Sequence, residues 1–141
     1  MMMLTASELT AIIWQGVPAA EGSGFQVEGV KADGVLCRLP FSLQQTRPGG
    51  TMSGPAMMML ADAAMYAAIL AQFGRLEMAV TQNLNINFLS RPAPTDLLAR
   101  AEILKAGHRT VVLDVKIFSE GSPVVVAHAT GTYSLPPAGR E

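Results

Sequence analysis

The fold is decided by the stretch PAMMMLADAAMYAAILAQF, residues 55–73, which is apolar except for Asp62, Gln72 and the hydroxyl of Tyr66. It is near the minimum length for a membrane span, but it is built on Ala and Met, and no basic flank sets an orientation. The central Asp62 would cost roughly 2.5–3.5 kcal/mol inside a bilayer. The stretch therefore predicts a helix buried at the centre of a protein and no membrane span.

The ends of this helix are marked by residues with suitable backbone preferences. Pro55 suits the first helical turn, with Ser53 or Gly54 as the cap. Gly74 is expected to end the helix. The preceding residues 47–55 are rich in Gly and Pro, which indicates a loop that leads directly into the helix.

Four strands are expected after the helix. In residues 80–88 the pattern changes to period two, so alternate side chains face opposite sides of a strand. One face is predicted to hold Val80, Gln82, Leu84, Ile86 and Phe88, and the other Thr81, Asn83, Asn85 and Asn87. Three further strands are predicted at residues 97–105, 111–118 and 124–133. An antiparallel sheet that curls around one central helix satisfies this order.

The N-terminal residues predict a short helix. Thr5 and Glu8 fit a capping box, which indicates a helix over about residues 5–15. Gly16 and Pro18 are expected to end it.

A hairpin is predicted between the two helices. Residues 25–30 and 35–40 resemble short strands, and Asp33-Gly34 between them is a strong hairpin signal. The chain is therefore expected to form one α+β domain over residues 1–141, with a frayed tail at residues 136–141.

The composition limits the classes of partner that are expected for the protein. The chain has 141 residues, of which 50% are hydrophobic and 15% charged, and its formal net charge is −1. No run of Lys or Arg indicates a nucleic-acid surface, and the low charge favours a buried subunit interface. Cys37 is the only cysteine, so neither an intrachain disulfide nor a zinc cage of cysteines can form, and no metal site is expected. The N-terminus lacks the pattern of a signal peptide, so the cytoplasm is the expected location.

Two features of the central helix point to chemistry. Asp62 is the only charged side chain between residues 48 and 74, and buried acids are usually paired or functional. Gly54 leaves its backbone N–H open at a helix N-terminus, which could polarise a carbonyl oxygen. Each feature also has a purely structural alternative. Asp62 could be a polar residue where the helix meets solvent, and Gly54 could belong to an ordinary capped helix.

The spacing of these two residues predicts a site shared by two subunits. Gly54 and Asp62 are eight positions apart, which corresponds to about 12 Å along a helix. One copy cannot place both against the same carbonyl carbon. Two antiparallel helices across a two-fold axis would bring Gly54 of one subunit to Asp62 of the other.

Several short segments carry a family resemblance. They are residues 50–54, 60–64, 79–88, 91–93, 107–109 and 127–133. Together they resemble phenylacetyl-CoA-thioesterase-like hotdog proteins, over roughly residues 25–135. The resemblance implies a hotdog fold, in which an antiparallel sheet wraps a long central helix, and a homodimer that often pairs into a tetramer. It also implies an acyl-CoA substrate, with CoA as part of that substrate and no other cofactor.

The resemblance assigns roles to individual residues. The acid that matches Asp62 is the general base or nucleophile, the N–H that matches Gly54 polarises the thioester carbonyl, and a hydroxyl that matches Thr81 orients the attacking water. Two positions depart from the family motif, because Ser53 stands in place of His and Pro55 in place of a second Gly.

A third departure is Arg47, which stands where the family often has Asn. This arginine could bind a substrate carboxylate, stabilise the oxyanion, or pair with Asp62. The sequence leaves these three roles open.

The leading prediction is an acyl-CoA thioesterase. Its predicted catalytic residues are Asp62, Gly54, Thr81 and Ser53. Its predicted substrate contacts are Arg47, Thr51, Met58, Asn83, Arg91 and Arg109. The first alternative is a non-catalytic hotdog module that binds acyl-CoA or a related lipid. The second, hydration of an enoyl-CoA, is disfavoured because no His lies near Asp62.

Overall fold

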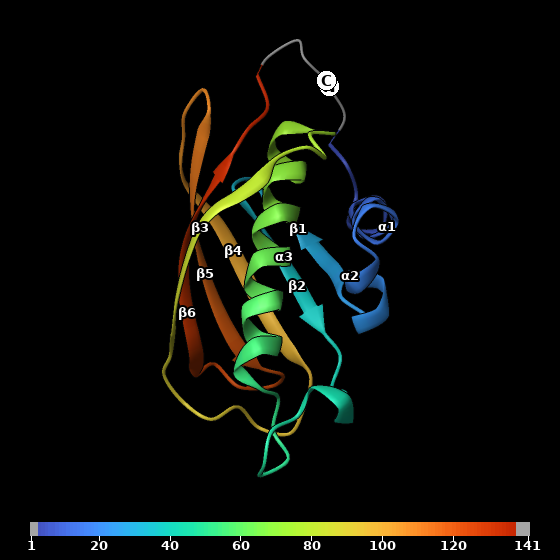
Figure 1. Ribbon diagram of the computed structural model, residues 1–141, viewed down its shortest axis with the longest axis vertical. Helices are drawn as coiled ribbons and strands as arrows, with labels where there is room; N and C mark the ends of the chain where they lie inside the picture. Colours follow the sequence, from blue (N-terminus) through green and yellow to red (C-terminus); the bar gives the residue numbers. More distant parts are fainter. Residues whose placement is uncertain (1–2, 138–141) are drawn as a thin grey trace.

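The computed structural model of the chain describes residues 3–137. Three α-helices and six strands follow one another in the order shown in Figure 1. The helices are α1 (Ala6–Gly16), α2 (Pro18–Ser23) and α3 (Gly54–Phe73), and a 3-10 turn η1 (Leu43–Gln45) precedes α3. The strands are β1 (Gln26–Val30), β2 (Gly34–Leu39), β3 (Val80–Phe88), β4 (Leu97–Ala106), β5 (Thr110–Ser119) and β6 (Val125–Ser134).

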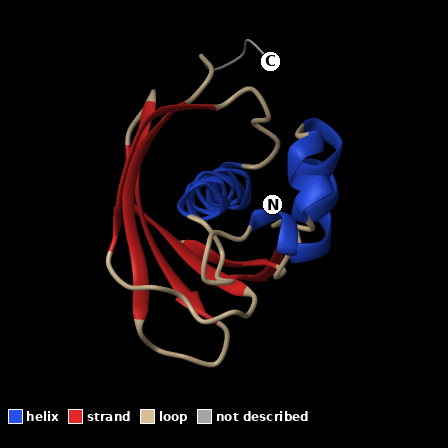
Figure 2. Cartoon of the chain, turned by 60° about the horizontal axis from the view of Figure 1, so that its bottom comes forward, coloured by secondary structure: helices blue, strands red, loops and turns tan. Residues whose placement is uncertain are grey.

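The six strands form one antiparallel sheet in the order β1-β2-β4-β5-β6-β3. Figure 2 shows the sheet curled around α3, with α1 and α2 on the side of α3 that the sheet leaves open. β3 follows α3 directly in the chain but pairs with β6, so β1 and β3 are the two edges. The predicted hotdog arrangement, a sheet wrapped around a long central helix, is confirmed.

The core lies between α3 and the concave face of the sheet. The predicted alternation in β5 is confirmed, because Val111, Leu113, Val115 and Ile117 are all 0% exposed. By length and composition α3 could cross a membrane, since its mean hydropathy reaches 1.5. Eleven of its residues are buried within the protein, which agrees with the predicted core helix.

One glycine sets how closely α3 approaches the sheet. A Cβ atom on Gly131 of β6 would lie 2.6 Å from Sδ of Met65 and 2.9 Å from the carbonyl oxygen of Asn83. Neither distance is possible for a real side chain, so Gly131 leaves a notch that Met65 of α3 fills.

The N-terminal helix has the predicted cap, and a second helix follows it. The Thr5 side chain accepts a hydrogen bond from the N–H of Glu8, and the Glu8 carboxylate accepts one from the N–H of Thr5. Pro18 was expected only to end a helix, but it also begins α2, because proline fits the first turn of a helix. The left-handed Gly24, with φ of 80°, ends α2.

The predicted hairpin is present, but Gly34 is required there for a reason other than the turn. Gly34 is the first residue of β2 and pairs with Glu102 of β4. A Cβ atom at this position would lie 2.1 Å from the carbonyl oxygen of Ala101. Gly34 is therefore required by the close approach of β4. Of the frayed tail predicted at residues 136–141, only residues 136 and 137 are described, as half-buried coil; the rest lies outside the described residues.

Candidate active site

Asp62 lies half-buried on α3, with two hydroxyl groups on one of its carboxylate oxygens. The Thr81 hydroxyl donates to Oδ1 of Asp62 at 2.7 Å, and the Tyr133 hydroxyl donates to the same oxygen at 2.8 Å. Tyr133 also lies 3.2 Å from the backbone carbonyl oxygen of Asp62. Within residues 3–137 no side chain or backbone group bonds to Oδ2, so that oxygen is available to a substrate or a water molecule.

Thr81 reaches Asp62 because β3 is not a regular strand. The pairing of β3 with β6 shifts between Thr81 and Asn83, which leaves Gln82 as an extra residue. Thr81 therefore faces α3, and so do Leu84 and Ile86 further along the strand, which pack against the core. The predicted strict alternation, with Thr81 and Leu84 on opposite faces, is wrong at this bulge.

Tyr133 was not among the predicted site residues. It is 3% exposed, and burial together with the Asp62 charge raises the pKa of its phenol well above the usual value. The phenol therefore keeps its proton and remains a hydrogen-bond donor to Asp62. Its ring stacks on Tyr66, with 6.2 Å between the ring centres and 16° between the planes. The Tyr66 hydroxyl donates to the carbonyl oxygen of Glu77 at 2.9 Å.

An apolar cavity of about 500 Å³ opens beside Asp62, and we call it the Asp62 cavity. Thr81 and Tyr133 line it together with Asp62, and its walls come from α1, α2, α3, the segment before β3 that contains Glu77, the start of β3 and β6. The apolar part of the wall includes Ile13, Val17, Met59, Ala63, Met78 and Val80. The carboxylate thus stands at a cavity suited to an apolar group.

The N-terminus of α3 has the predicted cap and an open backbone donor. The Ser53 hydroxyl accepts a hydrogen bond from the N–H of Ala56 at 3.2 Å, which confirms Ser53 as the cap. The N–H of Gly54 has no partner among the described residues, and Pro55 has no N–H to offer. A Cβ on Gly54 would lie 3.4 Å from the ring of Phe88, so the aromatic ring covers one side of this glycine.

A second cavity, of about 410 Å³, lies at this end of α3, and we call it the Arg47 cavity. Its polar side chains are Arg47, Thr51, Ser90 and Arg91, and none of the acidic residues within the described range 3–137 lines it. Gly54 also lines it, so the residue with the open N–H and both arginines contribute to the same concavity.

The predicted site residues therefore fall into three groups. Asp62 and Thr81 line the Asp62 cavity. Gly54, Arg47, Thr51 and Arg91 line the Arg47 cavity. Ser53, Met58, Asn83 and Arg109 line neither cavity. The separation of Asp62 from Gly54 within one chain agrees with the spacing along the helix.

Three of these residues lie on exposed surfaces. Met58 is 43% exposed on α3, and Asn83 is exposed on the edge strand β3. Arg109 lies in the turn between β4 and β5, where its Nε–H donates to the carbonyl oxygen of Leu135 at 3.4 Å. Arg47 forms no ion pair within residues 3–137, so pairing with Asp62, one of the three roles that the sequence left open, does not occur inside one chain.

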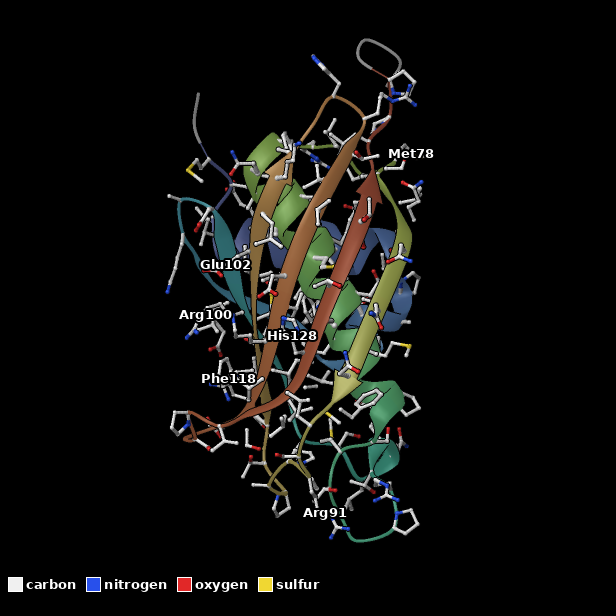
Figure 3. The ribbon with its side chains drawn as sticks, turned by 90° about the vertical axis from the view of Figure 1, so that its left-hand side faces the viewer. Met78, Arg91, Arg100, Glu102, Phe118 and His128 are labelled. Carbon is white, nitrogen blue, oxygen red and sulfur yellow. The ribbon has the colours of Figure 1, made fainter. Side chains whose placement is uncertain are left out.

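The two histidines lie away from both cavities. His108 is exposed in the turn between β4 and β5. His128 of β6 pairs with Asp114 of β5 at 2.5 Å. Figure 3 shows His128 on the convex face of the sheet. No group of His, Cys, Asp and Glu side chains in the described part of the chain could hold a metal ion.

Comparison with known proteins identifies a family and a fold. The sequence pattern of the thioesterase superfamily matches residues 49–126. A candidate thioesterase from Silicibacter is 37% identical, with a TM-score of 0.85, and the match covers 97% of this chain and 96% of that one. None of the proteins with curated functions matches the chain.

Two more distant structures share the fold. A thioesterase from Haemophilus influenzae is 18% identical, with a TM-score of 0.85, over 96% of this chain and 93% of that one. A candidate thioesterase of Ralstonia eutropha, described as related to phenylacetic acid degradation, is 21% identical, with a TM-score of 0.75, over 84% of this chain and 89% of that one.

Proposed function

Because the chain belongs to the thioesterase superfamily, we propose that it hydrolyses the thioester bond of an acyl-CoA at a site shared by two copies of the chain. Thioester hydrolysis is the activity that the family supports, and the acyl-CoA substrate, the role of Asp62 and the shared site are the proposal. One observation carries it: the Asp62 carboxylate lines a mostly apolar cavity, its Oδ1 is held by two hydroxyls, and its Oδ2 has no partner among residues 3–137.

The reaction begins with a proton transfer to Asp62. Oδ2 takes a proton from a water molecule, whose oxygen forms a bond to the thioester carbonyl carbon. The carbonyl oxygen becomes an oxyanion, which accepts a hydrogen bond from the N–H of Gly54 in a second copy. The C–S bond then breaks, and the proton held by Asp62 passes to the sulfur. The products are a carboxylic acid and the free thiol of CoA.

Thr81 and Tyr133 fix the carboxylate for this step. The two hydroxyls converge on Oδ1, so they hold the plane of the carboxylate and direct Oδ2 away from both donors. Thr81 was predicted to orient water, and its bond to Asp62 supports a role that includes orienting the base.

The geometry of α3 favours a shared site. Met58 lies midway between Gly54 and Asp62, four residues from each, and it is 43% exposed. If a two-fold axis passes beside Met58, the α3 helices of the two subunits lie antiparallel. Gly54 of each subunit then lies next to Asp62 of the other, which gives two equivalent sites. The two cavities then meet across the interface.

The edge strand β3 offers the surface for such a dimer. Its nine residues are on the open edge of the sheet, and Val80 and Phe88 are 57% and 49% exposed. An exposed edge with apolar side chains is a template for pairing with another strand. A dimer is the smallest assembly that completes the site, and a dimer of dimers would contain the same site.

The departures from the family motif leave the necessary groups in place. Pro55 removes one backbone donor, but the N–H of Gly54 stays open. The Ser53 hydroxyl uses its oxygen to cap α3, and its own proton is still able to donate.

Mixed oligomers of two defective variants test the proposal. Asp62→Asn removes the base, and Gly54→Pro removes the backbone donor in the other half of the site. The backbone accepts proline there, because position 54 is in the first helical turn and Ser53 has the extended conformation, with ψ of 164°, that a following proline requires. Gly54→Ala is the matched control, since it keeps the N–H and places its Cβ 3.4 Å from Phe88.

Release of free thiol from acyl-CoA gives the readout. We expect Asp62→Asn to lower kcat by about 10²–10⁴-fold and Gly54→Pro by a similar factor. Co-refolded equal mixtures should regain about a quarter of the wild-type activity, because half of the dimers are mixed and each holds one intact site. A mixture as inactive as its components would refute the shared site. Undiminished hydrolysis by Asp62→Asn would refute the mechanism, and tight acyl-CoA binding without thiol release from the wild type would favour the non-catalytic module.

A further inference from the structure

Two arginines share the Arg47 cavity without an acidic partner. Neither Arg47 nor Arg91 forms an ion pair within residues 3–137, and no acidic residue lines the cavity. A Cβ on Gly49 would lie 3.6 Å from Nη1 of Arg91, so the guanidinium of Arg91 packs against the turn that carries Arg47. Figure 3 shows Arg91 beside this turn, below the ends of the strands. Two cations in a cavity of about 410 Å³ favour an anionic ligand between them.

The turn that carries Arg47 is held by its own backbone. The N–H of Arg47 donates to the carbonyl oxygen of Thr51 at 2.9 Å, and the N–H of Gly50 donates to the carbonyl oxygen of Arg47 at 2.9 Å. Gly49 and Gly50 have φ values of 105° and 82°, which other residues rarely adopt. The turn therefore presents Arg47 from a defined backbone, which lowers the entropy lost on binding a ligand.

A buried hydroxyl supplies an independent indication of a ligand. Thr51 lines the cavity and is 5% exposed, and its Oγ1 has no hydrogen-bond partner among the described residues. Buried hydroxyls are nearly always satisfied, so an unpaired one at a cavity wall indicates a polar group that binds there. Together with the open N–H of Gly54 at the start of a 20-residue helix, the cavity offers a set of donors.

We propose that the Arg47 cavity binds a carboxylate carried by the acyl group of the substrate, within a few bonds of the thioester carbonyl. This inference rests on the proposed function, which places the carbonyl oxygen at Gly54. Because Gly54 lines the same cavity as both arginines, an anion bound there lies close to the reacting carbonyl. The phosphates of CoA are separated from that carbonyl by the whole pantetheine arm. A second acid group on the acyl chain is the anion that fits this position.

The other walls suit a short acyl linker. Met57 and Phe88 contribute apolar surface beside the arginines, against which methylene groups would pack. The Asp62 cavity of the facing subunit is mostly apolar, and two acids, Asp62 and Glu77, line it. It therefore repels a second carboxylate and accepts the uncharged part of the substrate.

Four thioester substrates distinguish binding of an acyl carboxylate by the arginines from binding of a CoA phosphate. Succinyl and butyryl groups have similar length and differ in the terminal carboxylate. Each is offered as the CoA thioester and as the N-acetylcysteamine thioester, which has no phosphate. The measured quantity is the selectivity, the ratio of kcat/KM for succinyl over butyryl on the same carrier. The variants are Arg47→Gln and Arg91→Gln. The control is Arg100→Gln, whose arginine lies 5.1 Å from the ring centre of Phe118 on the convex face (Figure 3).

The wild type should prefer succinyl on both carriers. Each variant should lower the selectivity about tenfold to a hundredfold, mainly through KM for the succinyl substrates, because one charge-assisted hydrogen bond is lost. Arg100→Gln should keep the wild-type selectivity. Equal kcat/KM for the two acyl groups in the wild type would overturn the inference. The inference would also be overturned if the variants lowered kcat/KM for both CoA substrates and for neither N-acetylcysteamine thioester. The arginines would then bind the phosphates of CoA.

A binding measurement keeps this inference separate from the proposed function. Succinate and inorganic phosphate are titrated into the wild type and the two variants by calorimetry. If no thioester is hydrolysed, the proposed function fails, yet succinate binding that both variants lose would still support the carboxylate site. Hydrolysis that depends on Asp62, together with no succinate binding and no succinyl preference, would overturn the carboxylate site alone.

Discussion

The Tyr133 hydroxyl lies 2.8 Å from Oδ1 of Asp62, although 71 positions separate the two residues in the chain. The Tyr133 hydroxyl donates to the proposed base, so we expect Tyr133 to act as a positioning residue. We expect Tyr133→Phe to lower kcat about tenfold with little change in KM, because the carboxylate loses one of its two donors. Tyr66→Phe removes the hydroxyl of the stacked partner, which bonds the Glu77 carbonyl instead, and should lower kcat less. Equal effects of the two variants on kcat would contradict the positioning role.

Met58 provides a test of the interface. In the proposed dimer each Met58 faces its copy across the two-fold axis, so Met58→Glu would bury two like charges beside one another. The dissociation constant should rise more than about a hundredfold, and activity should fall with it. Leu104→Glu is the control, since Leu104 is 60% exposed on β4. Sedimentation at several protein concentrations measures the assembly, and an unchanged dimer of Met58→Glu would place the interface elsewhere.

The Asp62 cavity should set the length of uncharged acyl groups, which have no carboxylate to hold them in the Arg47 cavity. Ala63 lines it next to the carboxylate, so Ala63→Leu fills part of its volume of about 500 Å³. We expect the preferred acyl chain to shorten by about three carbons, the number that the substitution adds. Activity over a series of straight-chain acyl-CoAs measures this shift. Ala32→Leu, at an exposed position in the β1–β2 turn, should leave the series unchanged, and an unaltered optimum in Ala63→Leu would exclude this cavity as the acyl site.

Asp96 should contribute to stability in a pH-dependent manner. The backbone N–H of Phe41 and, after it, the Arg38 guanidinium hold the pKa of Asp96 below its usual value of about 3.9. Between the two pKa values the unfolded chain binds more protons, so this contribution is present above pH of about 4 and is lost as the pH falls through the folded pKa. Asp96→Asn should therefore be less stable than the wild type at pH 7, with a difference that narrows in acid.

Urea unfolding at a series of pH values measures this difference in the free energy of unfolding. Parallel curves for Asp96→Asn and the wild type from pH 7 down to pH 2 would show that Asp96 makes no linked contribution.

Local patterns predicted the elements of this protein well. The apolar run of α3 and the alternation of β5 follow from which side chains are buried, and burial repeats with the period of the element. Asp62 was identifiable for the same reason, since one charge in an apolar helix has no local explanation. The capping box of α1 involves only neighbouring residues, which is why Thr5 and Glu8 were sufficient to locate it.

Long-range relationships were outside the reach of these patterns. The pairing of Val80 with Ser134 joins strands that are far apart in the chain, and no periodicity encodes it. The bulge at Gln82 depends on that pairing, so the orientation of Thr81 could not be deduced from alternation. Tyr133 had no distinguishing signal, because an aromatic residue near the end of a strand is common.

The notch at Gly131 has a consequence for catalysis. Met65 enters that notch and follows Asp62 by three positions, so the two side chains point about 60° apart around the helix axis. Because the Met65 sulfur packs at Gly131, α3 cannot rotate about its own axis, and the orientation of the Asp62 carboxylate is fixed. The orientation of the proposed base thus depends on the absence of a Cβ atom at Gly131 of β6.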